Sequence, residues 1–188
     1  MDVTKLYPED AKIVFRGKIF SIVQWTQKMY DGTYSTFERI IRPSTAMVIP
    51  IKSDGKIILS KQEQPGLKPF IGLVGGVVNL DENPENAAKR ELLEESGYEA
   101  ENWILWDQVQ LSEKIEWTVY TYIAKNLKVK QNPTPDNGEK IETFEVTFEE
   151  FIQFTHNENF RDIEIALKIH RMENNKEKMM ETKHLFSP

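Results

Sequence analysis

The chain has 188 residues, which is enough for one well-buried domain with an appendage but too few for two full domains. Hydrophobic residues make up 39% of it, which excludes global disorder, and the formal net charge of −6 argues against nucleic acid or an anionic membrane as a partner. The chain has no Cys and only three scattered His, so it offers neither a thiolate nor a histidine-rich metal site. Any metal is therefore expected to be held by oxygen atoms.

The sequence carries no sign of a membrane span or a leader. No apolar stretch reaches the roughly 18 to 20 residues that cross a bilayer, and the opening segment MDVTKLYPEDAK lacks the basic and then apolar pattern of a secretory signal. We also find no internal repeat and no low-complexity linker. The sequence therefore predicts one compact, soluble, cytoplasmic unit.

The first third of the chain reads as β-structure. Residues 18–29 are rich in β-branched and aromatic side chains, Asp31-Gly32 is a strong hairpin turn signal, and residues 34–41 return. We predict an N-terminal antiparallel hairpin here. Apolar runs at 46–51 and 56–60, on either side of a turn at 53–55, predict two further strands of a central sheet.

A helix with clear ends follows a glycine-rich bend. Asn83 and Pro84 supply an N-cap and a proline for the first helical position, and Gly97 accommodates the left-handed backbone of a helix end. The helix is therefore expected from Pro84 to Ser96. Later elements are expected as strands at 103–110, 116–124 and 140–146, a polar loop at 131–138, and helices at 148–155 and 162–172. The tail beyond Glu173 is expected to fray.

Residues 76–98 hold the constellation that carries chemistry. They read Gly76, five residues, Glu82, seven residues, Arg90-Glu91-Leu92, one residue, Glu94-Glu95, one residue, Gly97-Tyr98. The chance that such a spacing arises at random is on the order of one in a million, from residue frequencies of roughly 5 to 10%.

Three carboxylates of this stretch share one helix face. Glu91, Glu94 and Glu95 stand at i, i+3 and i+4, so their Cβ atoms are expected within roughly 5 to 6 Å of one another. A compact set of carboxylates is neutralised by Mg²⁺ or Mn²⁺, which commonly share their coordination shell with substrate phosphates. The face therefore suggests a diphosphate substrate. Arg90 could orient Glu94 by a forked hydrogen bond, and the bend at 73–76 could offer a backbone carbonyl to the metal.

The spacing of residues 76–98 resembles the signature of the Nudix hydrolases, with Tyr98 standing where the family usually has an aliphatic residue. The resemblance implies an α/β fold, a Nudix-type α/β/α sandwich with a mixed sheet, plus the N-terminal antiparallel hairpin segment. The stretches FRGKIFSI (15–22), FERIIRP (37–43) and AMVIPI (46–51) look like the ADP-ribose and nucleoside-diphosphate-sugar pyrophosphatase branch. That branch implies a homodimer, with residues 1–42 as a dimerisation segment and 43–188 as the hydrolase domain.

The resemblance also implies roles for the acidic residues. Carried over by position, the carbonyl of Gly75 and the carboxylates of Glu91 and Glu95 are the main metal ligands, and Glu94 is a ligand or a base. The loop DNGEKIE (136–142) resembles one that commonly supplies a further glutamate. It makes Glu139 the candidate catalytic base.

Other positions remain open as alternatives. Glu142, Glu113 or Glu116 could serve as the base in place of Glu139, and the last two could contact substrate. Arg39 and Arg42 could hold a phosphate or ribose by bidentate contacts. Trp25 and Trp117 could stack on a base.

The resulting prediction is a pyrophosphohydrolase that uses Mg²⁺ or Mn²⁺ and cleaves a nucleoside diphosphate linked to a moiety such as a sugar, giving a nucleoside monophosphate and a sugar phosphate. The segment 110–117 lacks the proline of ADP-ribose-specific members, and Gly72-Leu-Val-Gly-Gly76 replaces their Glu-Leu-Pro-Ala-Gly, so base and sugar are not readable. One alternative is a pyrophosphohydrolase of nucleoside triphosphates or capped RNA. Another is a non-catalytic nucleotide-sugar sensor, although all three box glutamates are present.

Overall fold

The computed structural model describes residues 6–188 and contains two β-sheets and four helices. Within these residues no helix combines the length and the apolarity that a membrane span needs. The strands are β1 (Lys12–Arg16), β2 (Ser21–Lys28), β3 (Tyr34–Ile41), β4 (Thr45–Pro50), β5 (Ile57–Glu63), β6 (Phe70–Gly72), β7 (Val74–Val77), β8 (Tyr98–Ser112), β9 (Ile115–Val129) and β10 (Lys140–Val146). The helices are α1 (Pro84–Ser96), α2 (Phe148–Thr155), α3 (Ile163–Glu173) and α4 (Lys176–Leu185).

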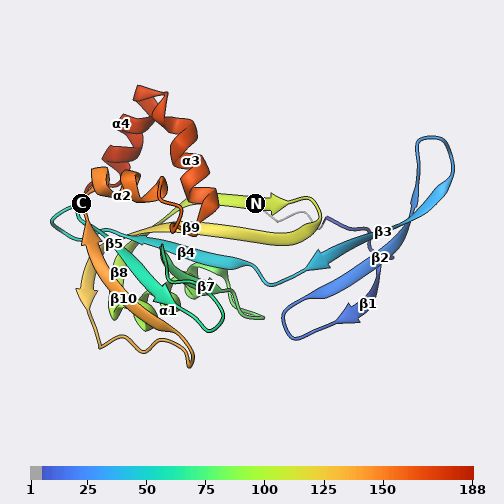
Figure 1. Cartoon of the computed structure of the whole chain (residues 1–188), viewed down its shortest axis with the longest axis horizontal. Helices are drawn as coiled ribbons and strands as arrows, with labels where there is room; N and C mark the ends of the chain where they lie inside the picture. The colour runs from blue at the N-terminus through green and yellow to red at the C-terminus, as the bar shows by residue number, and fades with distance from the viewer. Residues whose placement is uncertain (1–5) are drawn as a thin grey trace.

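The larger sheet is mixed and lies between helices. Its order is β1-β2-β3-β9-β4-β7, with β8 pairing β9, and β4 runs parallel to β9 but antiparallel to β7. Helix α1 lies on one side of β4 and β9, and α2, α3 and α4 lie on the other (Figure 1). The smaller sheet has the order β10-β5-β6. The predicted sandwich of helices around a mixed sheet is confirmed.

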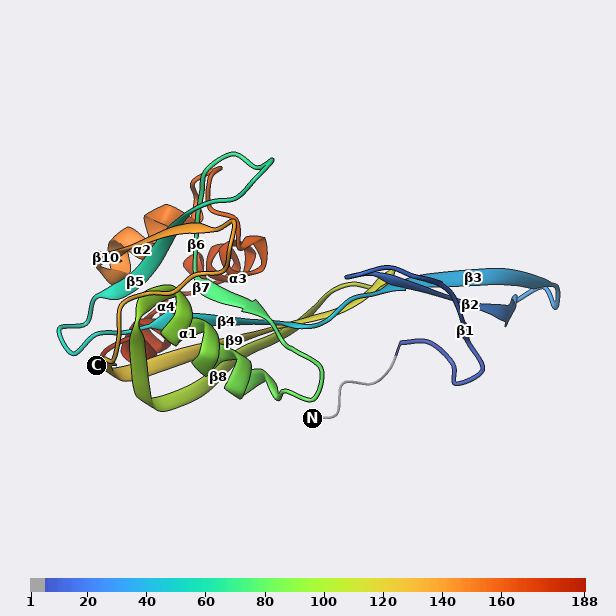
Figure 2. The same cartoon turned by 90° about the horizontal axis from the view of Figure 1, so that it is seen from below.

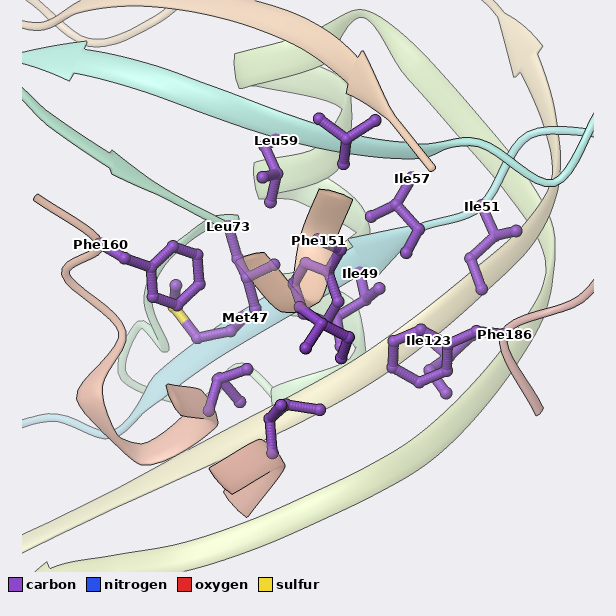
Figure 3. Packing of buried hydrophobic residues seen from close by; sticks show 14 of the residues in the cluster. Met47, Ile49, Ile51, Ile57, Leu59, Leu73, Ile123, Phe151, Phe160 and Phe186 are labelled. Atoms are coloured by element: carbon purple, nitrogen blue, oxygen red, sulfur yellow. The ribbon is translucent and has the colours of Figure 1, made fainter. Parts of the chain in front are cut away.

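Strand β4 explains why residues 46–51 read as a continuous apolar run. Met47 and Ile49 face the core formed with α2 and α3, whereas Ala46 and Val48 face the core formed with α1. A strand covered on both faces alternates between two interiors rather than between interior and solvent. The core toward α2 and α3 is shown in Figure 3, where the ring of Phe151 reaches in among aliphatic side chains.

The predicted pairing of residues 56–60 with 46–51 in one central sheet is wrong. Strand β5 belongs to the three-stranded sheet. Its pairing with the segment that follows β4 is limited to an isolated bridge between Ile51 and Ile57. The reason is that a strand has two edges, and those of β4 are already occupied by β7 and β9.

The predicted fraying beyond Glu173 is also wrong. Residues 176–185 form α4, Asn175 caps its first turn, and Phe186 is 2% exposed. The ring of Phe186 meets that of Trp106 edge-on, with the centroids 5.3 Å apart. The sequence of α4 is rich in lysine and glutamate and does not indicate a packed helix. The residue that anchors the helix, Phe186, lies just beyond its end.

The N-terminal hairpin is confirmed and gains one strand. Strands β2 and β3 pair around Asp31-Gly32, and β1 adds to the outer edge of β2. The three strands extend away from the rest of the molecule (Figure 2). All five residues of β1 are exposed, including the apolar side chains of Ile13 and Phe15.

Candidate active site

Local signals fix helix α1 at both ends. The side chain of Asn83 accepts a hydrogen bond from the backbone N–H of Asn86 at 2.8 Å, and Pro84 occupies the first turn. At the other end Gly97 adopts a φ of 75° and donates its N–H to the carbonyl of Leu93 at 2.9 Å. A side chain on Gly97 would also clash with the backbone oxygen of Gln131. These caps set which helix residues face the bend at Gly75 and Gly76.

Substitution of Gly97 by Ala tests this cap. We expect a loss of about 2 to 4 kcal/mol in the free energy of unfolding, from left-handed backbone strain and the clash with Gln131. Gly32→Ala is the matched control, because Gly32 also has a positive φ but has open space around its Cβ position. Urea unfolding followed by circular dichroism measures both. Equal losses in the two variants would show that the contact with Gln131 contributes nothing.

The predicted metal-binding and catalytic residues line one pocket of about 400 Å³. The charged side chains come from α1 and from the loop before β10, Asn79 comes from the loop before α1, and the backbone comes from β7. The lining residues are Gly75, Gly76, Val77, Asn79, Arg90, Glu91, Glu94, Glu95, Asp136 and Glu139. The fold thus brings a loop that lies more than forty residues downstream against the glutamates of the helix.

Arg90 organises the acidic residues of this pocket. Its Nε and Nη2 form a fork with the carboxylate of Glu82, both at 3.1 Å. Its Nη1 donates to Glu91 at 2.7 Å and to Glu94 at 3.0 Å. These carboxylates raise the pKa of Arg90, with Glu82 as the largest cause, and Arg90 in turn lowers the pKa of Glu82. Arg90 therefore orients three carboxylates, where the sequence indicated one.

Glu95 is the most deeply placed of the acidic residues on α1. It is 5% exposed, and its Oε2 accepts a hydrogen bond from the N–H of Gly75 at 2.9 Å. Burial raises its pKa to about 8, and the charges of Glu91, Glu139 and Asp162 act in the same direction. Burial also raises the pKa of Glu91, although Arg90 opposes it. These carboxylates are more stable when a proton or a cation neutralises them.

The glycines of the bend permit this close approach. A side chain at Gly75 would clash with the backbone of β4, and one at Gly76 would occupy the space of the Glu91 carboxylate. Helix and bend can therefore pack with acidic oxygens directly against backbone. The oxygen donors suit a hard divalent cation. Within residues 6–188 no three acidic or imidazole groups already converge on one point, and Arg90 lies between Glu91 and Glu94.

The structure separates the candidates for a general base. Glu139 lies in the pocket, where Gln64 donates a hydrogen bond to its carboxylate at 3.0 Å and burial raises its pKa. Glu142 is exposed on β10. Glu113 lies on the exposed turn between β8 and β9, and Glu116 lies beside the N-terminal strands, so neither lines the pocket.

A second cleft of about 290 Å³ adjoins the acidic pocket and shares Gly75, Gly76 and Val77 with it. The guanidinium of Arg42 lies here over the ring of Trp117, 4.3 Å from its centroid. The Nε of Arg42 is buried and has no hydrogen-bond partner in the described part of the chain. Because Arg42 lines the cleft, its guanidinium could pair with an anionic ligand that enters it.

Trp25 and Arg39, which were also predicted to contact substrate, lie elsewhere. Trp25 and Arg39 are on neighbouring strands of the projecting sheet, with the guanidinium 5.9 Å from the ring centroid. Arg39 lines a hollow of about 520 Å³ on that sheet, and its Nε and Nη1 have no partner among residues 6–188. Within one chain this hollow has no lining residue in common with the acidic pocket.

Sequence reasoning missed two neighbours of the site. Gln64 on the loop after β5 contacts Glu139, and Asp162 at the start of α3 accepts a hydrogen bond from Leu73 at 2.6 Å. Neither lies in a motif, and their partners are 75 and 89 residues away in sequence. Only the folded structure brings them together.

The structure has helices on both sides of a mixed β-sheet, and its acidic helix α1 packs against a glycine-rich bend. This is the fold class that the signature of residues 76–98 predicted. Residues 41–167 match the family described as NUDIX domain. This match covers well over half of the sequence, so the chain belongs to the Nudix family, and the resemblance is confirmed.

Individual relatives place it more closely. The chain is 27% identical over 159 residues to the ADP-ribose pyrophosphatase of Bacillus subtilis (strain 168) and 26% identical over 160 residues to the methanol dehydrogenase activator of Bacillus methanolicus. Each alignment covers 83% of this chain and 86% of the relative. A structure titled "Crystal structure of ADP compounds hydrolase" matches with a TM-score of 0.71 at 20% identity, covering 89% of this chain and 94% of that one. These findings confirm the predicted class, a Nudix hydrolase resembling ADP-ribose pyrophosphatases, in a family that generally uses a divalent metal.

Proposed function

We propose that the protein is a Mg²⁺- or Mn²⁺-dependent pyrophosphohydrolase of nucleoside diphosphates linked to a sugar. The observation that carries the proposal is the junction of two clefts at Gly75–Val77, one lined by the glutamates of α1 and the other by the half-buried side chain of Arg42. A diphosphate across this junction would meet metal-binding oxygens on one side and the guanidinium of Arg42 on the other.

The residues of the acidic pocket have three roles in this proposal. Glu91, Glu94, Glu95 and the carbonyl of Gly75 would hold the cation, which when bound would neutralise charge and acidify water. Arg90 positions the carboxylates through its hydrogen bonds. Glu139 accepts the proton of the attacking water. Its pKa is raised by burial, which brings a carboxylate closer to the range useful for a general base at neutral pH.

The names of the relatives support an adenosine diphosphate derivative as the substrate class. The Bacillus subtilis relative is an ADP-ribose pyrophosphatase, and the matching structure is of an ADP compounds hydrolase. In the second cleft Arg42 would bind a phosphate, and Trp117 holds the guanidinium in place from the other face. The products would be a nucleoside monophosphate and a sugar phosphate.

A phosphate-release screen tests the proposal. The purified protein is incubated with Mg²⁺ and ADP-ribose, nucleoside diphosphate sugars, dinucleotides or nucleoside triphosphates, and added phosphatase reveals monoester products. We expect turnover of diphosphate-linked sugars. Turnover restricted to nucleoside triphosphates would overturn the substrate assignment, and metal binding without any turnover would favour a sensor.

We further propose that residues 1–42 form a dimerisation segment and that 43–188 form the hydrolase domain. The projecting sheet exposes Ile13, Phe15, Ile19 and Phe20, at 46 to 55% each. Apolar side chains gathered on an extension of the fold support burial against a partner surface. A second copy of this chain could cover these apolar side chains.

Replacement of Phe15 by Glu should therefore convert a dimer into a monomer at micromolar concentration, because a charge would be placed in an apolar interface. Light scattering coupled to size-exclusion chromatography measures the mass. Leu80→Glu serves as the control, since Leu80 is 93% exposed and lies on the loop before α1. A wild-type chain that runs as a monomer would contradict the proposal.

A further inference from the structure

The connection between α2 and α3 reaches the second cleft by pairing with β6. Phe160 forms a parallel bridge with Ile71, the N–H of Ile71 donates to the carbonyl of Asn159, and the N–H of Arg161 donates to the carbonyl of Ile71, both at 2.9 Å. The connection thus lies along the edge of β6 that β5 leaves free. Its backbone is held in register with the strand that leads into the bend at Gly75.

Two further contacts anchor this connection. Phe160 is 5% exposed, and its ring lies beside Leu73 and Met47 in the core (Figure 3). The carboxylate of Asp162 accepts a hydrogen bond from the N–H of Leu73 at 2.6 Å. Residues 160 and 162 are therefore fixed to the segment just before Gly75. Side chains of this connection and of the first turn of α3 that line the cleft therefore have a defined position relative to the acidic pocket.

Two charged side chains from this region line the cleft. The guanidinium of Arg161 lies over the ring of Phe70, 4.5 Å from its centroid, and it makes no ion pair within residues 6–188. Glu164, on the first turn of α3, also lines the cleft and has no cationic partner in the same range. Its pKa is raised by burial, with Asp107 adding to the effect. An exposed donor fork and a half-buried acceptor thus line the same cleft without an ion-pair partner among the described residues.

We propose that Phe70, Arg161 and Glu164 form the subsite for the sugar at the far end of the diphosphate, an inference that rests on the proposed function. A carboxylate accepts hydrogen bonds from two neighbouring hydroxyls, and a guanidinium donates to a hydroxyl or ring oxygen. A further phosphate at this end would be repelled by the carboxylate of Glu164. An apolar group would leave the half-buried carboxylate of Glu164 without a hydrogen-bond donor. A polyhydroxylated moiety can form hydrogen bonds with both Glu164 and Arg161.

The test compares two substrates that share the scissile diphosphate. ADP-ribose carries the distal sugar, and the methyl ester of ADP lacks it. Glu164→Gln and Arg161→Met should lower kcat/KM for ADP-ribose by about ten- to a hundred-fold, as expected for loss of a hydrogen bond to a charged group, and leave the methyl ester within about two-fold. Glu158→Gln and Arg171→Met are matched controls, because both residues are exposed, near or on α3, and outside the cleft.

The outcomes separate the two proposals. An equal loss of kcat/KM on both substrates would show that the variants damage the structure, and it would overturn the sugar subsite. No loss on either substrate would also overturn the sugar subsite. If the wild-type protein turns over neither substrate and none of the other diphosphate-linked sugars of the screen, the proposed function fails. The subsite is then judged by titration calorimetry. Tighter binding of ADP-ribose than of the methyl ester, lost in Glu164→Gln, would support it, and equal binding would overturn it.

Discussion

Replacement of Glu94 or Glu95 by Gln should lower turnover by roughly 10² to 10⁴-fold without unfolding the protein. Each change removes one negative charge and keeps the shape of the side chain. In Glu95→Gln the amide oxygen can still accept the hydrogen bond from Gly75, which is 2.9 Å from the carboxylate in the wild type. In Glu94→Gln the amide oxygen can still face Arg90. Steady-state rates with Mg²⁺, together with circular dichroism, measure the two effects.

Glu85→Gln is the matched control for both variants. Glu85 lies on the first turn of the same helix, and its partner is the exposed Lys89 at 2.6 Å. An exposed pair of this kind contributes little to stability, so the control should retain full activity. Unchanged turnover in both Glu94→Gln and Glu95→Gln would refute the assignment of the metal site. A loss in the control of the same size would instead point to damage of the helix.

The part of the site that lies on α1 could be predicted because its determinants are local. Asn83, Pro84 and Gly97 fix the ends of the helix, and the helical period then places Glu91, Glu94 and Glu95 on a common face. The hydrogen bond from Arg90 to Glu94 also follows from a spacing of four residues. Helix α2 has the predicted bounds, 148–155, and the structure shows a capping box of Thr147 and Glu150 at its start.

The remainder depends on contacts between distant segments. The sequence could not show that Gln64 lies beside Glu139 or that Asp162 holds Leu73, since backbone pairing of β5 with β10 and of β6 with the α2–α3 connection sets those distances. The sequence also could not show that β5 lies outside the central sheet. An apolar run predicts a strand, but it does not indicate with which strand it pairs. The positions of Trp25 and Arg39 follow from how far the N-terminal strands project (Figure 2).

The stability of the metal-free protein should fall as pH rises, because of Glu95. Burial raises the pKa of this carboxyl from 4.5 to about 8 in the folded chain. Between these values the folded protein keeps a proton that the unfolded chain has released. The unfolded state then binds fewer protons, so the free energy of unfolding decreases with pH. The stabilising contribution is complete below about pH 4.5 and is lost by about pH 8.

Urea unfolding in the presence of a chelator at pH 5.5 and pH 8 tests this, with Glu95→Gln as the reference. Each unit of pH between the two pKa values corresponds to about 1.4 kcal/mol, so the wild type should lose about 3 kcal/mol more than the variant over this interval. Asp162, whose pKa is raised by burial to about 7, acts in the same direction but is present in both proteins. Mg²⁺ at pH 8 should restore stability to the wild type and much less to the variant, because a cation replaces the proton on the buried carboxylate. Parallel pH dependence in the two proteins would mean that Glu95 is not the buried acid that the cation neutralises.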